Sequence, residues 1–309
     1  DKDVWRGVVP RNGMQTDRSK FVNPRPTQLP PDGSPVMIHR LLSPWTGDQP
    51  YPSSDPSQKC RWTIFRVNGK SSPMCVHTQD DIVSGSIIRG GRWGDCDQLS
   101  KWWTSIDTTN ATYVEIGGNI GACVMHMLMV TDALDIRVFE PNPANLFCLT
   151  STLLRFPEAQ RKRVTVYPFA LGELAEGSQI FGAKHNMGNS VVGKIIKDGP
   201  GQEFNAPVPI RVVRYDSVIG PEVRVALMKM DAQGFECNIM RGMGERRVEV
   251  IKTEIANHWL SSHENCDDTI LFGLFKTRGM VVFDVRGERM SRPAAPGVWD
   301  VLVRHAHYD

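Results

Sequence analysis

The sequence predicts an α/β protein with a doubly wound, mainly parallel sheet of seven strands and an antiparallel hairpin at its end. From residue 113 onward, short apolar runs alternate with amphipathic stretches, which is the pattern of a parallel sheet covered by helices. The last two apolar runs, residues 280–285 and 299–304, have no helical stretch between them. We therefore expect these two runs to pair as antiparallel strands.

The chain divides by composition into three predicted regions. Residues 1–58 are rich in proline and polar residues, which predicts an extended arm with at most one short element at 36–42. Residues 59–107 predict a subdomain of short strands and helices. Asn68-Gly69 is a hairpin turn signal there, between strands expected at 60–67 and 74–77. Residues 108–309 form the predicted main domain.

The remaining elements of the main domain follow in order. The predicted strands are 113–116, 135–139, 163–171, 223–230 and 248–255. The predicted helices are 122–130, 143–156, 236–243 and 267–277. Residues 179–181 and 208–213 are expected to be strands that flank an irregular loop holding Asn189 and Ser190.

The composition describes a globular protein without an obvious polyanion partner. Hydrophobic residues make up 40% of the chain, charged residues 23%, and the net charge is +2. The basic clusters at 161–163 and 246–247 are short and fall at expected helix ends, so we expect no nucleic-acid partner. No apolar run approaches the ~20 residues of a membrane-spanning helix.

The seven cysteines leave the cellular compartment open. Cys123 and Cys148 fall in predicted helices and are expected to be buried free thiols. The others that stand in less regular sequence could pair under oxidising conditions: Cys60, Cys75, Cys96 and Cys266. With the sequon at Asn110, this pattern fits the secretory pathway or Golgi lumen, and a cytoplasmic location stays open. The start at Asp1, without a methionine, predicts a processed or trimmed product, from which a signal peptide or anchor could have been removed.

A glycine-rich turn follows the strand at 113–116 and precedes the helix at 122–130. Its residues are Glu115, Gly117, Gly118, Asn119 and Gly121. Strand, glycine turn and helix in this order form a nucleotide-like binding edge in open α/β sheets. The dinucleotide fingerprint would require glycine where Asn119 stands. An acidic residue in the turn suits a ligand with a positive charge and hydroxyls, such as S-adenosylmethionine.

Carboxylates recur at the ends of successive strands, where parallel strands share one crevice. These residues are Glu115, Glu140, Asp231 and Glu254. Like charges repel, so such a concentration favours a binding site over a structural role. Glu140 follows Gly121 by one helix and one strand, where a carboxylate can accept hydrogen bonds from ribose hydroxyls.

Five sequence blocks in this order resemble the FkbM family of S-adenosylmethionine-dependent methyltransferases. They are Val114 to Gly121, Val138 to Asn142, Ala170-Leu171-Gly172, Tyr215 to Val218 and Met228 to Glu236. The resemblance spans roughly residues 80–285 and implies a Rossmann-like class I fold. It implies that the cofactor lies among Glu115, Gly117, Gly118, Asn119, Gly121, Glu140, Pro141, Asn142, Ala170 and Leu171. It also implies methylation of a hydroxyl oxygen, often on a sugar or glycan.

For the chemistry, Asp231 is the first candidate for the base that takes the hydroxyl proton. Glu254 and His258 follow the next strand and could assist. These three residues could instead hold a divalent cation such as magnesium. Gln233 stands where the family usually has an acid, which counts against a shared metal or base role at that position.

Two other functions are compatible with parts of the pattern. An NAD-dependent sugar oxidoreductase would account for the strand–helix–strand unit and Glu140, but Asn119 counts against it. A non-catalytic binding module on the same fold would account for Gln233. The acceptor and the oligomeric state cannot be predicted from the sequence.

Overall fold

The computed structural model describes residues 43–79, 81–197, 201–284, 286–291 and 298–305. Most of the predicted arm, residues 1–42, therefore lies outside the described residues. Residues 43–58 contain no helix or strand and run along the folded body. The Trp45 N–H donates to the Val166 carbonyl at 2.8 Å, and the Tyr51 N–H donates to Thr150 Oγ1 at 2.8 Å.

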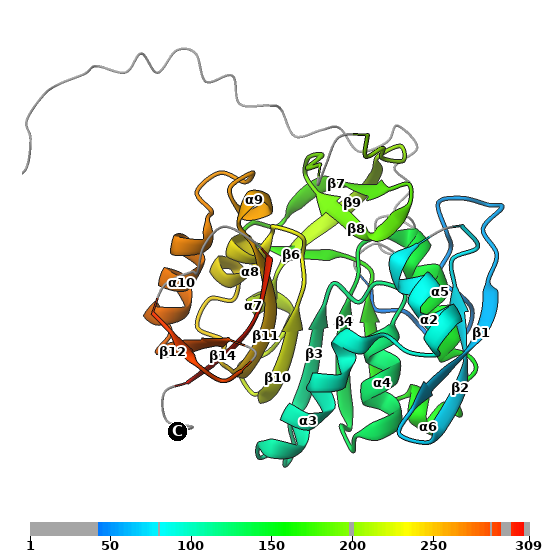
Figure 1. Cartoon of the computed structure of the whole chain (residues 1–309), viewed down its shortest axis with the longest axis horizontal. Coiled ribbons are helices and arrows are strands. Elements are labelled where there is room, and N and C mark those ends of the chain that lie inside the picture. Colours follow the sequence, from blue (N-terminus) through cyan, green and yellow to red (C-terminus); the bar gives the residue numbers. More distant parts are fainter. Residues whose placement is uncertain (1–42, 80, 198–200, 285, 292–297, 306–309) are drawn as a thin grey trace, which may run out of the picture.

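A large mixed sheet forms the centre of the molecule (Figure 1). Its strands, in spatial order, are β13 (Arg289–Met290), β12 (Met280–Asp284), β14 (Val298–His305), β11 (Val248–Ala256), β10 (Val225–Met230), β3 (Thr112–Ile116), β4 (Asp135–Phe139) and β5 (Val164–Tyr167). The strands from β11 to β5 are parallel, and β14 is antiparallel to both β11 and β12. The predicted α/β class, the mainly parallel sheet and the closing antiparallel pair are confirmed. Within the described residues, the two-residue β13 brings the central sheet to eight strands instead of the predicted seven.

Helices cover both faces of this sheet because its central strands are apolar on both sides. On one face pack α3 (Asp97–Ser105), α4 (Ala122–Val130) and α5 (Pro143–Leu153). On the other pack α8 (Glu236–Gly242) and α10 (Asp268–Thr277). The side chains of β3 divide between the two faces. Tyr113 packs in the hydrophobic cluster under α3, α4 and α5, whereas Val114 and Ile116 pack in the cluster under α8 and α10. The short helices are α6 (Glu158–Arg161), α7 (Tyr215–Val218) and α9 (Asn257–Leu260).

A second sheet of four strands lies above the carboxyl ends of the central strands (Figure 1). Its order is β6 (Ala170–Gly172), β9 (Val208–Arg214), β7 (Glu176–Ala183) and β8 (Asn186–Val192). The predicted single strand at 163–171 is wrong, because the chain leaves the central sheet after Tyr167 and β6 pairs with β9 instead. Pro168 has no N–H to continue the ladder. The predicted irregular loop at Asn189 and Ser190 is also wrong, since both residues lie in β8.

The predicted hairpin near the N-terminus consists of β1 (Arg61–Val67) and β2 (Lys70–Val76). Asn68 and Gly69 have φ of 48° and 72°, as a tight two-residue turn requires. Phe65 and Val67 point into the core, whereas Trp62 and Ile64 remain exposed on the outer side. After the hairpin come α2 (Ile82–Gly90) and the short η2 (Gly94–Cys96).

Three disulfides cross-link the described part of the chain. They join Cys60 to Cys75, Cys96 to Cys123, and Cys237 to Cys266. Cys148 is a buried free thiol, as predicted. The prediction for Cys123 is wrong, because α4 packs beside η2 and brings this thiol to Cys96.

The Cys96–Cys123 link should contribute measurably to stability. It closes a separation of 27 residues, so its loss should lower the free energy of unfolding by about 3 kcal/mol. Chemical denaturation of the Cys96→Ser/Cys123→Ser double variant measures this change. The hairpin double variant Cys60→Ser/Cys75→Ser closes a shorter loop of 15 residues and serves as a comparison. An unchanged denaturation midpoint would show that the link contributes nothing.

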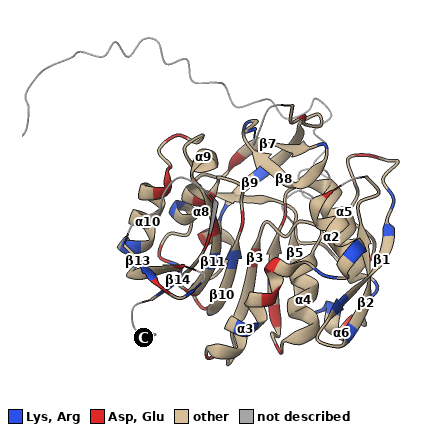
Figure 2. Ribbon diagram, viewed as in Figure 1, with Lys and Arg blue, Asp and Glu red and all other residues tan. Residues whose placement is uncertain are grey.

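Charged side chains of both signs are spread over the ribbon (Figure 2). Lys and Arg predominate along β1, β2 and α6 in that view. Among the helices of the described residues, none has the length and apolar character needed to cross a membrane.

Candidate functional site

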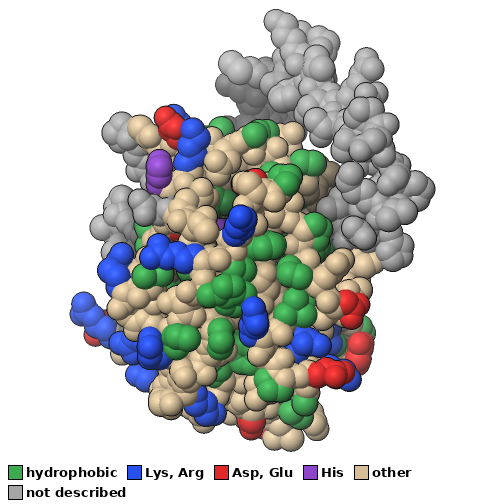
Figure 3. Space-filling model, turned by 90° about the vertical axis from the view of Figure 1, so that its right-hand side faces the viewer, with side chains coloured by type: hydrophobic (Ala, Val, Ile, Leu, Met, Phe, Trp, Pro, Cys, Tyr) green, Lys and Arg blue, Asp and Glu red, His purple; other side chains and the backbone are tan. Residues whose placement is uncertain are grey.

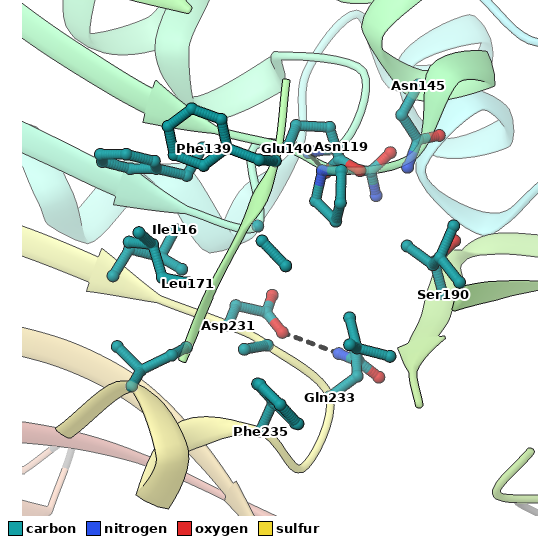
Figure 4. Close-up of a pocket in the computed structure, with 18 of the residues that line it drawn as sticks. Ile116, Asn119, Phe139, Glu140, Asn145, Leu171, Ser190, Asp231, Gln233 and Phe235 are labelled. Carbon is teal, nitrogen blue, oxygen red and sulfur yellow. Dashed lines mark hydrogen bonds between the residues drawn. The ribbon is translucent and has the colours of Figure 1, made fainter. Parts of the chain in front are cut away.

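A pocket opens at the carboxyl ends of β3, β4 and β10, beneath the second sheet (Figure 4). Its floor comes from the central sheet and its roof from β7 and β8. The lining residues include Ile116, Gly117, Asn119, Phe139, Glu140, Pro141, Asn145, Phe169, Ala170, Leu171, Ile180, Ser190, Asp231, Gln233 and Phe235. Polar groups and aromatic rings therefore converge on one cavity, which is the usual character of a small-molecule site.

The glycine turn brings the ends of β3 and β10 unusually close together. Gly117 has φ of 79°, and a Cβ atom there would stand 1.9 Å from the backbone oxygen of Asp231. Only glycine fits both the conformation and the space. Asn119 also has a left-handed backbone, with φ of 48°, and its Oδ1 accepts from the Ile120 N–H at 2.6 Å. The turn thus exposes backbone to the pocket at the start of α4.

Glu140 is the acidic centre of the pocket and is 4% exposed. Its Oε2 accepts from the Asn119 N–H and its Oε1 from the Asn142 N–H, both at 2.7 Å. Burial raises the pKa of Glu140 to about 7, although these two N–H groups act in the opposite direction. The Asn145 side chain also donates to this carboxylate, so of its roughly four acceptor positions one remains free for a ligand, and a ligand hydroxyl can also compete with Asn145.

This pKa predicts that the affinity for the cofactor implied by the sequence resemblance, S-adenosylmethionine or its product, depends on pH. Ribose hydroxyls bind best to the ionised carboxylate, and Glu140 in the folded protein is protonated below about pH 7. The affinity for S-adenosylhomocysteine should therefore fall as the pH drops from 8 to 6, by at most about tenfold per pH unit. Calorimetric titration at several pH values measures this. In Glu140→Gln the dependence should vanish, and a dependence that persists there would assign the titration to another group.

Asp231 enters the pocket from the end of β10 and is held from two sides. Its Oδ2 accepts from Lys229 Nζ at 2.9 Å, and its Oδ1 accepts from Gln233 Nε2 at 2.7 Å (Figure 4). Burial alone would raise the pKa of Asp231, but Lys229 and Gln233 outweigh it and the pKa is lowered. Asp231 is therefore an ionised hydrogen-bond acceptor rather than a strong base.

Glu115 lies beside this pair but does not line the pocket. It is 2% exposed and accepts from the Tyr113 hydroxyl at 2.9 Å. Burial raises the pKa of Glu115 to about 7, against the opposing effect of Lys229 in the adjacent strand. In turn, although burial alone would lower the pKa of Lys229, nearby carboxylates raise it. Glu115 thus belongs to a buried charge network behind the pocket.

The network continues along β11 and β14. Lys252 forms ion pairs with Asp300, at 2.9 Å, and with Asp95 from η2. Glu254 follows two residues later on the same strand and is in register with Asp300. Burial, together with the carboxylates of Asp231 and Asp300, raises the pKa of Glu254 to about 8. A carboxyl group with this pKa can exchange a proton near neutral pH.

The structure brings many of the predicted site residues together. Those that line the pocket are Gly117, Asn119, Glu140, Pro141, Ala170, Leu171 and Asp231. Gly118, Gly121 and Asn142 lie just behind it. Gly118 packs against Val138, Gly121 begins α4, and Asn142 caps α5 through the Ala144 N–H at 2.9 Å.

Glu254 and His258 do not line the pocket. His258 is exposed on α9, 5.2 Å from the Trp259 ring. Within the described ranges, no group of three or more His, Cys, Asp or Glu side chains could hold a metal ion, so the magnesium alternative gains no support.

One charged residue of the site, Lys229, is missing from the sequence prediction. Lys229 pairs with Asp231, and its only signal is a charged residue inside the apolar run of β10. The roof of the pocket includes Ile180 and Ser190, which lie in strands of the second sheet. The Ser190 hydroxyl accepts from Asn142 Nδ2 at 2.8 Å, which ties the roof to the start of α5.

Solved structures with a similar arrangement include several from archaea and bacteria. A putative transferase from Pyrococcus horikoshii is 12% identical, with 79% of this chain and 71% of that chain covered and a TM-score of 0.40. A SAM-dependent O-methyltransferase from Thermotoga maritima is 10% identical, with 79% and 77% covered and a TM-score of 0.39. M. jannaschii TYW2 in complex with AdoMet is 13% identical, with 79% and 85% covered and a TM-score of 0.37. No curated protein matches the sequence.

A family model is the informative comparison. The model described as the methyltransferase FkbM domain matches residues 115–275. This range begins in β3, includes the glycine turn, Glu140 and Asp231, and ends in α10. Since the match covers more than half of the 309 residues, the chain belongs to the FkbM methyltransferase domain family.

Proposed function

We propose that the protein transfers a methyl group from S-adenosylmethionine to a hydroxyl oxygen of a sugar, glycan or other small molecule. The observation that supports this most is the position of Glu140 within a family of methyltransferases. Its carboxylate is fixed by two backbone N–H groups and can still accept from hydroxyl donors such as those of a ribose. Family membership favours methyl transfer over the oxidoreductase alternative.

The lining residues fit such a cofactor. Gly117 contributes only backbone to the lining of the pocket, and Glu140 suits the ribose hydroxyls. Phe169, Ala170 and Leu171 offer an apolar surface for a flat purine ring. When bound, S-adenosylmethionine supplies an electrophilic methyl group and a sulfur leaving group.

Asp231 and Glu254 suit two different steps of the transfer. Asp231 has a lowered pKa and a neutralising partner in Lys229, so it is suited to hold the acceptor hydroxyl in line for attack. Glu254 does not line the pocket, but its pKa of about 8 lets it take up a proton near neutral pH. We therefore assign to Asp231 the orientation of the acceptor and the first hold on its proton, and to Glu254 the uptake of that proton from Asp231.

The test is a transfer assay with methyl-labelled S-adenosylmethionine and a panel of monosaccharides and oligosaccharides. We expect label in an ether linkage with the wild type. Glu254→Gln should lower the turnover number by about 100-fold or more while its affinity for S-adenosylhomocysteine stays unchanged. Label on nitrogen or carbon, or no labelled product from the panel, would contradict the proposal.

The three disulfides also bear on where this reaction takes place. Disulfides persist in oxidising compartments and are rare in the cytosol. We therefore propose an oxidising compartment, such as the lumen of the secretory pathway, as the working location. Alkylation of free thiols in the protein isolated from its native source tests this, since only Cys148 should react after denaturation without reduction.

A further inference from the structure

The outer side of the β1–β2 hairpin exposes large apolar side chains away from the pocket. Trp62 is 42% exposed and Ile64 39% exposed. Pro73 is in register with Ile64 on the neighbouring strand and is exposed as well. We call this surface, together with Arg66 on the same side and the exposed Lys59 and Arg61 at its edge, the hairpin face.

The charge of the hairpin face departs sharply from that of the whole chain. The hairpin region, residues 59–76, contains four Lys or Arg residues and no Asp or Glu, and the next acidic residues along the chain are Asp55 and Asp80, whereas the chain as a whole has 36 basic and 34 acidic residues. Arg155, which ends the α5 region, adds a further cation, 4.6 Å from the Trp62 ring centroid. Figure 3 shows hydrophobic side chains gathered on this side of the molecule with Lys and Arg among and around them.

The exposed apolar side chains and the excess of basic residues together indicate the kind of partner. Apolar side chains with a basic surround match the interface of an anionic bilayer, where Trp and Ile enter the headgroup region and Lys and Arg meet lipid phosphates and carboxylates. A soluble polyanion would use the cations but gain nothing from exposed Ile64 and Pro73. We infer that the hairpin face docks the protein peripherally on a membrane surface rich in anionic lipid.

Docking in this way leaves the pocket unchanged. None of the residues of the hairpin face lines it. The rigid hairpin, held by the Cys60–Cys75 disulfide and by Phe65 and Val67 in the core, presents its outer side without rearrangement.

Sedimentation of the full chain with lipid vesicles tests the inference. We expect binding to phosphatidylcholine vesicles that contain about 30% phosphatidylserine and weak binding to phosphatidylcholine alone. Loss of one cation should weaken binding roughly fivefold. Lys59→Glu/Arg61→Glu replaces two cations by anions and should therefore weaken binding by well over fivefold. Trp62→Ser/Ile64→Ser should weaken it at every salt concentration.

Matched controls lie elsewhere on the surface. Leu174→Ser removes an exposed apolar side chain, and Arg247→Glu/Arg286→Glu reverses two exposed charges outside the hairpin face. Both should bind vesicles like the wild type, and all variants should keep their thermal midpoint and their affinity for S-adenosylhomocysteine. Equal binding to both vesicle types, or unchanged binding of Trp62→Ser/Ile64→Ser, would overturn the inference. Retention on heparin without vesicle binding would indicate a polyanion instead, and hairpin-dependent dimers would indicate a second copy.

Discussion

Replacing Glu140 by alanine should weaken the binding of S-adenosylhomocysteine by about 100-fold or more. Two hydroxyl hydrogen bonds to a charged acceptor contribute about 3 kcal/mol or more together. The substitution also removes the acceptor of the Asn119 and Asn142 N–H groups, so the glycine turn and the start of α5 lose their common anchor. Calorimetric titration with and without magnesium measures the affinity.

The control variant, Glu140→Gln, separates the loss of the hydrogen bonds to the ligand from the loss of those to the Asn119 and Asn142 N–H groups. Glu140→Gln keeps an oxygen for one of the two N–H groups and places an amide donor against the other. It should bind with an affinity between those of the wild type and Glu140→Ala. If Glu140→Ala bound as tightly as the wild type while remaining folded, the pocket would not hold the ribose at Glu140, and the cofactor assignment would need another acceptor.

Much of the fold could be predicted because the signals are local. The helix predicted at 122–130 and the strand at 135–139 match α4 and β4. Alternation of apolar runs with amphipathic stretches identifies these elements without knowledge of their neighbours. The positions of Glu140 and Asp231 follow from the same rule, because the carboxyl ends of parallel strands meet at one edge.

The errors concern pairings between residues that are far apart in sequence. Whether 163–171 is one strand or two depends on Val212, the partner of Ala170 in β9. Whether Cys123 is a free thiol depends on how η2 packs beside α4. Neither of these contacts leaves a periodic pattern in the sequence. Glu115 is a different case, because it lies on the same side of β3 as Tyr113, to which it is hydrogen-bonded, and strand alternation alone could have placed it away from the pocket.

Replacing Gly117 by alanine should lower the free energy of unfolding by about 4 kcal/mol. Part of the loss comes from φ of 79°, which costs a residue with a side chain about 1 kcal/mol or more. The larger part comes from a Cβ atom that would stand 1.9 Å from the Asp231 carbonyl oxygen. Because both are backbone positions at strand ends, β3 and β10 must separate to make room. Chemical denaturation measures the change.

Gly69→Ala provides the matched control for this prediction. Gly69 has a similar φ of 72°, but a Cβ atom there would meet nothing within 4 Å. This variant should therefore lose only the conformational part, about 1 kcal/mol, and bind S-adenosylhomocysteine normally. The difference between the two variants measures the close approach of β3 and β10 at the floor of the pocket. If both variants lost the same free energy of unfolding, β3 and β10 could separate at Gly117 without cost. Asp231 would then lack the rigid support that its role in orienting the acceptor requires.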